Sequence, residues 1–119
     1  MPTTDIACSI SPYFDVFEGQ LDAFRALCER FVARTRSEPG CLYYGFGFDG
    51  NRVHCREAYR NAAGLLAHLQ NVADLLVESG KLAKLVRLEI VGSESELQQL
   101  RGPLAAYQAQ FLVLEYEIG

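Results

Sequence analysis

The chain has 119 residues, of which 50% are hydrophobic, and its 11 Lys and Arg against 15 Asp and Glu give a formal net charge of −4 at pH 7. This length and composition predict a single globular domain over residues 1–119, and they exclude two-domain enzymes, disordered chains, collagens and coiled coils. The acidic balance argues against nucleic acid as a partner, because a phosphate backbone attracts a basic surface.

The N-terminal residues MPTTDIACSI lack the basic stretch and apolar core of a secretory signal peptide, and no apolar run reaches about 18 residues. We therefore expect a cytoplasmic protein with no membrane partner. The spacing of the four cysteines provides no CxxC pair for zinc or redox chemistry. We expect reduced, mostly buried thiols, with a reactive thiol as the alternative, at Cys8, Cys28, Cys41 and Cys55.

Two elements are predicted in the first third of the chain. Residues 5–13 alternate apolar with small residues, which is the pattern of a half-buried strand, and Pro12 is expected to end its pairing. Residues 18–36 repeat apolar side chains every three or four positions, which predicts an amphipathic helix. Pro39 and Gly40 stop this helix.

A hairpin is predicted next. Residues 41–48 are rich in aromatic side chains and form its first strand, and residues 52–60 form the second. The turn at 49–51 has the sequence Asp-Gly-Asn, whose residues accept the positive φ of a tight turn. Alternation places four side chains of the second strand on the side that faces the helices: Val53, Cys55, Glu57 and Tyr59.

A second helix is expected to run from an N-cap at Asn61 to Ser79 and Gly80. Residues 84–92 alternate again and predict a strand, with one side formed by Val86, Leu88 and Ile90.

The C-terminal part of the chain predicts two shorter elements. Residues 93–96 resemble a capping segment for a short third helix, which Gly102 and Pro103 end. Residues 111–118 alternate and predict a last strand.

The resulting order is βαββα, then a strand, a short helix and a strand. A split β-α-β arrangement of this kind predicts an α+β fold, an antiparallel sheet with both long helices on one face. The opposite face carries small or mixed polar residues, and glycine and serine let a second backbone approach closely. We therefore expect a homodimer that pairs through this face, which includes Ser9, Gly45, Gly47, His54 and Arg56.

Residues 37–72 combine a Glu-Pro-Gly-Cys-Leu turn into a strand, a Glu-x-aromatic pattern at Glu57 and Tyr59, and an Ala-His pair at Ala67 and His68. In this combination the segment resembles the antibiotic biosynthesis monooxygenase (ABM) family of the dimeric α+β barrel superfamily. The resemblance implies a ferredoxin-like βαββαβ protomer, two sheets packed face to face in a dimer, and a pocket between sheet and helices.

The resemblance also bears on cofactors. Some family members oxidise quinol-like aromatic compounds with molecular oxygen and without metal or flavin, and others degrade haem. The chain departs from the haem-degrading pattern, because it has no Trp and carries Ser9 and Ser11, not an Asn, on its first strand. No His, Asp or Glu cluster has metal-ligand spacing, and no Gly-rich loop leads from a strand into a helix. We expect no cofactor and no metal.

His68 and Glu57 are the candidate catalytic residues. Helix geometry places His68 on the apolar stripe, where burial would keep the imidazole neutral and able to accept a proton from a bound phenol or hydroquinone. The alternative is a core histidine whose nitrogens bind backbone groups. Glu57 lies on the helix-facing side, where a carboxylate needs a partner, so it either orients His68 or anchors a structural hydrogen bond.

The candidate substrate-binding residues are aromatic. Tyr44, Phe46 and Tyr59 provide a lining suited to a flat ligand, or else they only pack in the core. With the resemblance, the residues predict a cofactor-independent monooxygenase acting on a small aromatic or quinol-like compound. The rival hypothesis is a non-catalytic homodimer that binds a small molecule or serves a structural role. A third hypothesis is an isomerase, or another cofactor-free enzyme, that uses the same base on a small carbonyl compound.

Overall fold

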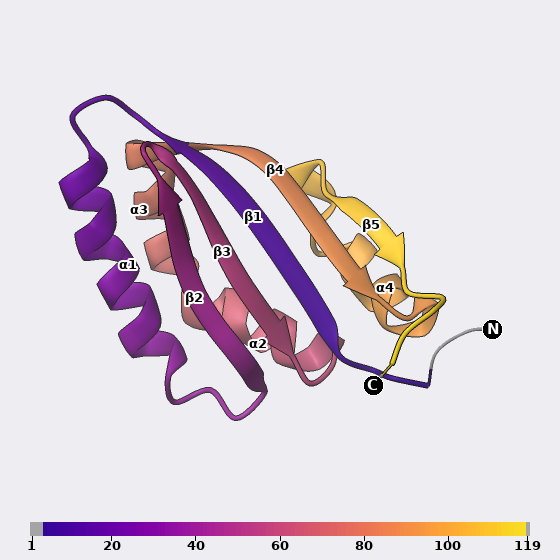
Figure 1. The fold of residues 1–119 in the computed structure, drawn as a ribbon. Coiled ribbons are helices and arrows are strands. Elements are labelled where there is room, and N and C mark those ends of the chain that lie inside the picture. The colour runs from indigo at the N-terminus through magenta and orange to yellow at the C-terminus, as the bar shows by residue number, and fades with distance from the viewer. Residues whose placement is uncertain (1–3, 119) are drawn as a thin grey trace.

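The computed structural model describes residues 4–118, so both ends of the domain predicted for 1–119 lie outside the described residues. Five strands form one sheet in the order β2-β3-β1-β4-β5, and the helices α1, α2 and α3 cover one of its faces (Figure 1). The elements in chain order are β1 (Cys8–Val16), α1 (Leu21–Thr35), β2 (Cys41–Asp49), β3 (Arg52–Tyr59), α2 (Ala62–Asn71), α3 (Ala73–Leu82), β4 (Ala83–Gly92), α4 (Glu94–Arg101), the 3-10 helix η1 (Ala105–Tyr107) and β5 (Gln110–Val113).

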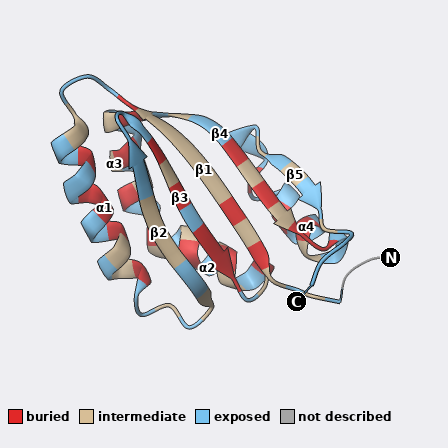
Figure 2. Cartoon of the chain, viewed as in Figure 1, coloured by how far each residue is buried: buried red, intermediate tan, exposed pale blue. Residues whose placement is uncertain are grey.

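The ferredoxin-like α+β fold is confirmed. The first four strands pair antiparallel, whereas β5 pairs parallel to β4, so the sheet is mixed and not wholly antiparallel as expected. Buried positions alternate along β3 and β4, where Figure 2 shows them as red bands. The core therefore lies between this face of the sheet and the helices. No helix among the described residues is long and apolar enough to cross a membrane.

The prediction that Pro12 ends the first strand is wrong. β1 continues to Val16, and Pro12 pairs with Leu88 of β4. On the other side, the pairing with β3 is interrupted after Ile10 and resumes at Tyr13. Because proline has no N–H, it interrupts a ladder on only one side of a strand that has a neighbour on each side.

An irregularity in β4 changes which side chains face the helices. Tyr13 pairs with Arg87 and Phe14 pairs with Leu85, which leaves Val86 as an extra residue between them. Such a bulge moves the following alternation by one position. Val86 is therefore exposed, contrary to the expected Val86, Leu88 and Ile90 stripe, and Leu85 is partly buried against the core instead.

The single helix predicted from Asn61 to Gly80 is two helices. Asn61 caps α2 as expected, since its side chain accepts from the backbone N–H of Gly64, but α2 ends at Asn71 and α3 follows after Val72. At the break, the carbonyl oxygen of Asn71 accepts a hydrogen bond from Arg34 of α1. Gly80 does not terminate a helix but lies inside α3.

The last predicted strand is shorter than expected. β5 covers only 110–113, and the following residues leave the sheet. The reason is that β4 ends at Gly92 and α4 begins at Glu94, so no strand remains beside the chain beyond Val113. The short third helix is present, and Ser93 caps it by accepting from the backbone N–H of Glu96.

Two glycines hold the loop between α1 and β2 against α2. A Cβ placed on Gly40 would lie 3.0 Å from the Cα of Gly64, so a larger residue at this position would push the two backbones apart by a few tenths of an ångström. Glu38 lies in the same loop, two residues before Gly40.

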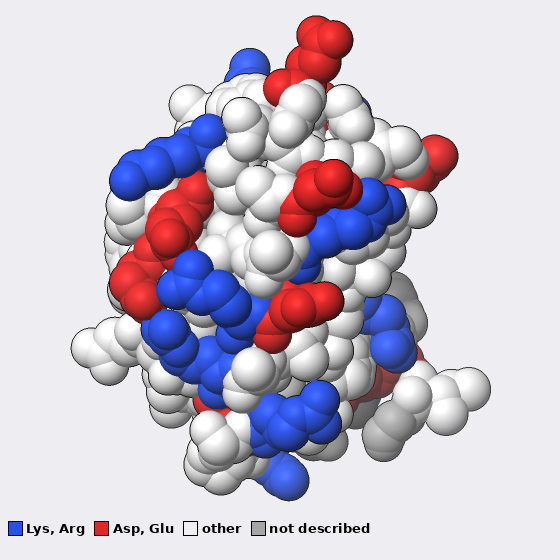
Figure 3. Space-filling view, turned by 90° about the vertical axis from the view of Figure 1, so that its left-hand side faces the viewer, with Lys and Arg blue, Asp and Glu red and all other residues white. Residues whose placement is uncertain are grey.

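The outer face of α1 and α3 is charged but not of one sign. Arg30 pairs with Glu78, and Arg34 pairs with Asp74. Figure 3 shows basic and acidic side chains interleaved over this side of the molecule. A surface of mixed charge such as this one offers no basic track for a phosphate backbone.

Candidate functional site

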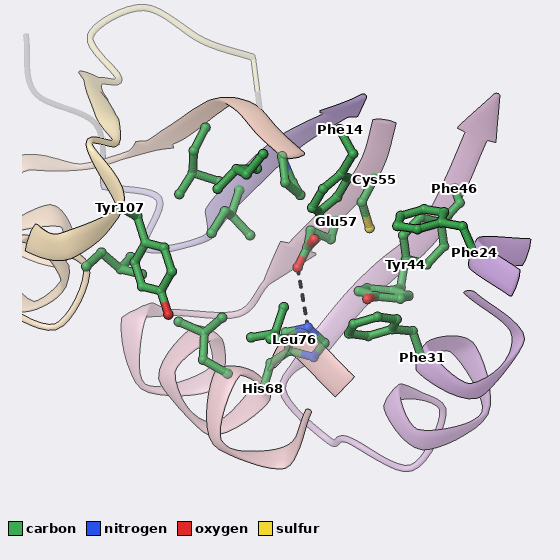
Figure 4. A pocket seen from close by; sticks show the side chains of 16 residues that line it. Phe14, Phe24, Phe31, Tyr44, Phe46, Cys55, Glu57, His68, Leu76 and Tyr107 are labelled. Atoms are coloured by element: carbon green, nitrogen blue, oxygen red, sulfur yellow. Dashed lines mark ion pairs between the residues drawn. The ribbon is translucent and has the colours of Figure 1, made fainter. Parts of the chain in front are cut away.

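A cavity lies between the sheet and the helices. The space that no atom fills is about 620 Å³ when open solvent at its mouth is counted, and about 80 Å³ of it can hold the centre of a water molecule. Figure 4 shows the side chains that line it, with Glu57 and His68 in the middle. The lining residues are Ile10, Pro12, Phe14, Phe24, Phe31, Tyr44, Phe46, Cys55, Glu57, His68, Leu69, Leu76, Leu85, Leu88, Leu104 and Tyr107.

Glu57 is a carboxyl group in an apolar environment. Its position in the alternation of β3 turns it toward the helices, and the residue is only 6% exposed. The hydroxyl of Tyr59 donates a hydrogen bond to Glu57 Oε1 at 2.6 Å. Burial raises the pKa of Glu57 to about 7, and the negative charge of Glu38 adds to the rise, while hydrogen bonds from Tyr59 and Cys55 oppose it. Glu57 thus exchanges its proton near neutral pH.

His68 lies on the buried face of α2 and is 2% exposed. Its Nε2 atom is 3.6 Å from Glu57 Oε1, and its Nδ1 atom is 2.9 Å from Glu38 Oε2 and 3.1 Å from Glu38 Oε1. Burial lowers the pKa of His68, while the hydrogen bond and charge of Glu38 oppose that effect. Since a carboxylate only accepts, Nδ1 carries the proton and the lone pair of Nε2 faces Glu57.

Glu38 completes a line of three groups, Glu38, His68 and Glu57, and sequence reasoning missed it. It lies in the loop after α1, and the side-chain amide of Asn71 donates to its Oε2 atom at 2.7 Å. The contact with His68 joins residues 30 positions apart, which no local pattern predicts. The available signal was its position just past the end of a helix, where the helix dipole disfavours an acidic side chain that has no other partner.

The three predicted aromatic residues lie in different places. Tyr44 and Phe46 line the cavity, whereas Tyr59 is fully buried behind Glu57 and does not line it. The rings of Tyr44 and Tyr59 each lie 5.1 Å from the imidazole of His68, measured between ring centroids. These contacts restrict the orientation of the imidazole, so Tyr44 has a place beside both the cavity and the base.

Cys55 is a second lining residue that sequence reasoning did not connect with the site. Its thiol hydrogen-bonds to Glu57, and burial together with the charge of Glu57 raises the pKa of the thiol. A thiol of this kind stays protonated and is a weak nucleophile. All four cysteines are free, and only Cys41 is less than fully buried.

The arrangement combines an acid and a base beside an apolar space. A carboxyl group with a pKa near 7 and a neutral imidazole are matched for proton transfer at physiological pH. Among residues 4–118, no group of three or more His, Cys, Asp or Glu side chains is placed to hold a metal ion. Glu57 and His68 together offer transfer of protons to and from a molecule bound in the cavity.

The sequence and the fold of the chain both match known proteins. The sequence model described as "Antibiotic biosynthesis monooxygenase" matches residues 10–73. The crystal structure of MupZ from Pseudomonas fluorescens is 49% identical, with a TM-score of 0.92 and coverage of 96% of this chain and 94% of that chain. A search of curated proteins finds no match.

More distant structures share the fold. Rv0793 from Mycobacterium tuberculosis is 23% identical, with a TM-score of 0.64, and the match covers 71% of this chain and 91% of that chain. PA3566 from Pseudomonas aeruginosa is 20% identical, with a TM-score of 0.61, and the match covers 74% of this chain and 92% of that chain.

Proposed function

The chain belongs to the antibiotic biosynthesis monooxygenase family, and we propose that it is a cofactor-independent enzyme in which Glu57 and His68 exchange protons with an apolar substrate. The observation that carries the proposal is the buried line of Glu38, His68 and Glu57 at the wall of an otherwise apolar cavity. A non-catalytic homodimer is not favoured, because a buried carboxyl and imidazole cost stability that a purely structural role does not require.

The first candidate reaction is a monooxygenation. Nε2 of His68 takes a proton from an activated CH₂ group of the bound substrate, and Glu38 stabilises the imidazolium that forms. The substrate anion then reacts with molecular oxygen, and the peroxide anion takes the proton back from the imidazolium of His68 to give a hydroperoxide. Neutral His68 next removes the second C–H proton as the O–O bond breaks and C=O forms, and protonated Glu57 gives its proton to the departing hydroxide, which leaves as water. The imidazolium then returns its proton to Glu57. In sum, CH₂ and O₂ become C=O and H₂O.

The second candidate is an isomerisation of a carbonyl compound. It is favoured by the distance of 3.6 Å between His68 Nε2 and Glu57 Oε1, which presents a base and an acid to the same small region. Such a pair can remove a proton from one carbon while the carbonyl oxygen receives another, which gives an enol. His68 then gives its proton to a different carbon as the enol oxygen returns its proton to Glu57, and this reaction consumes no oxygen.

Turnover in air and under argon distinguishes the candidates. A panel of anthrones, hydroquinones and enolisable enones is incubated with the protein, while an oxygen electrode records consumption and mass spectrometry identifies products. Uptake of one O₂ for each C=O formed supports the monooxygenase. Product that also forms under argon supports the isomerase. Binding without turnover in either atmosphere contradicts both the monooxygenase and the isomerase, and it supports the non-catalytic homodimer.

The proposal includes a homodimer in which two sheets pack through their uncovered faces. This face carries a stacked pair, Tyr13 and His54, with ring centroids 4.3 Å apart, and the guanidinium of Arg56 lies over the ring of Tyr43. A Cβ at Gly47 would meet no atom of the same chain, which leaves room for a partner backbone.

Light scattering is expected to give twice the chain mass for the unchanged protein. Gly47→Arg is expected to lower the measured mass, because the larger side chain occupies the space of the partner backbone. A monomeric mass for the unchanged protein contradicts the proposed homodimer.

A further inference from the structure

The cavity has two chemically different halves, one on each side of the Glu57 and His68 pair (Figure 4). Beside β2 and α1 the wall is aromatic and consists of Phe24, Phe31, Tyr44 and Phe46. Phe14 of β1 and Leu76 of α3 also pack on this aromatic side. Toward β4 and α2 the wall is aliphatic and includes Ile10, Leu69, Leu85, Leu88 and Leu104. Aromatic walls favour flat rings through stacked or edge contacts, whereas aliphatic walls favour saturated chains through burial of apolar area alone.

The reacting pair lies away from both ends of the cavity. The lining residues extend from β2 through β3 and β1 to β4, and neighbouring strands are about 4.8 Å apart, so the strands that contribute to the lining span roughly 14 Å of the sheet. Glu57 belongs to β3, which leaves one strand spacing on the aromatic side and two on the aliphatic side. The aliphatic half ends at Tyr107 of η1, a half-exposed residue. A molecule that fills both halves must be longer than it is wide.

The charge of the lining restricts the ligand further. None of the described residues that line the cavity is a Lys or an Arg, and Glu57 is itself acidic. A carboxylate or phosphate in either half would therefore lose its water without gaining a cation. A neutral group beside Glu57, such as a carbonyl, can instead accept a hydrogen bond from the protonated carboxyl.

From these observations we propose that the cavity takes an elongated, uncharged molecule with three parts: an aromatic or unsaturated end against β2 and α1, a saturated chain along β1 and β4 to Tyr107, and a reacting polar group between them at Glu57 and His68. This substrate class rests on the proposed function only in the placement of the reacting group. It differs from a compact flat aromatic compound, which would leave the aliphatic half empty.

The affinity of alkyl phenyl ketones tests the proposal. These probes have a ring, a central carbonyl and a chain that lengthens through acetophenone, butyrophenone, hexanophenone and octanophenone, and calorimetry gives their Kd values. We expect Kd to fall by up to about fourfold for each CH₂ until the chain reaches Tyr107. A phenylalkanoic acid as long as hexanophenone is expected to bind at least about tenfold more weakly. Affinity that is independent of chain length, or equal for the acid, overturns the proposal.

Tyr107→Ala locates the chain within the cavity. It is expected to weaken octanophenone by roughly three- to tenfold and to leave acetophenone unchanged, since only the longer chain contacts the ring. The matched control is Tyr116→Ala, because Tyr116 is 86% exposed and does not line the cavity. Equal effects of the two variants contradict the assigned direction of the chain.

The same data separate this inference from the proposed function. If affinity follows chain length but no probe or panel compound is turned over, the substrate class stands and the enzymatic proposal fails. If compact hydroquinones are turned over while affinity ignores chain length, the enzymatic proposal stands and the substrate class fails.

Discussion

Replacement of His68 by Asn is expected to lower kcat by about 100- to 10,000-fold, with a smaller change in KM. Nε2 is the only basic atom facing Glu57 among the described cavity-lining side chains, and asparagine keeps a polar group near Glu38 without supplying a base. Steady-state kinetics on whichever panel compound is turned over measures the effect. The chain offers a matched control in His54→Asn, since His54 lies on the opposite face of the sheet and stacks on Tyr13.

Glu38→Gln separates a positioning residue from the base itself. Glu38 contacts His68 and not the cavity, so its loss removes the charge that stabilises the imidazolium but leaves Nε2 in place. We expect a fall in kcat of roughly tenfold and a base whose pKa is lower than in the unchanged protein, because that charge opposes the effect of burial on His68. A pH profile of kcat identical to that of the unchanged protein, or full activity of His68→Asn, contradicts the assignment.

Much of this site follows from short-range patterns in the sequence. Alternation along residues 52–60 places Glu57 and Tyr59 on the same side of a strand, and their hydrogen bond confirms that geometry. Helical periodicity places His68 on the buried stripe, where the structure has it. These inferences succeed because strand and helix periods depend only on neighbouring residues.

The missed features depend on contacts between distant segments. Glu38 contacts His68 across 30 positions, in a loop where Gly40 lies against Gly64 of α2. The sequence does not show which segment either residue meets. At the break between α2 and α3, the carbonyl oxygen of Asn71 accepts a hydrogen bond from Arg34 of α1. The bulge at Val86 depends on the pairing between two strands. Contacts between distant segments determine the position of Glu38, the helix break and the bulge. Periodicity does not contain this information, so it predicts one continuous helix and a regular strand.

Replacement of Glu57 by Gln is expected to stabilise the protein at about pH 8 by roughly 3 kcal/mol more than at pH 4.5. The reason is the pKa of Glu57, which burial raises from 4.5 to about 7 in the folded chain. Below pH 4.5 the carboxyl is protonated in both states. Between pH 4.5 and about 7 the unfolded chain releases a proton that the folded chain keeps, so the free energy of unfolding falls as pH rises. Glutamine does not ionise and avoids this loss.

Urea unfolding of both proteins between pH 4.5 and about pH 8, at one protein concentration, measures the difference. His68 contributes a slope of opposite sign in both proteins, because its lowered pKa makes stability fall as pH drops below its ordinary value of 6.5. The neighbouring Tyr59, Tyr44 and Cys55 have raised pKa values and stay protonated throughout. Curves that remain parallel would show that Glu57 does not ionise in a buried site. A difference in the free energy of unfolding that widens toward alkaline pH would show that the buried Glu57 ionises with a raised pKa. If Glu57→Gln also binds the ketones but no longer turns over the substrate, the group whose ionisation costs stability is also the group that the reaction needs.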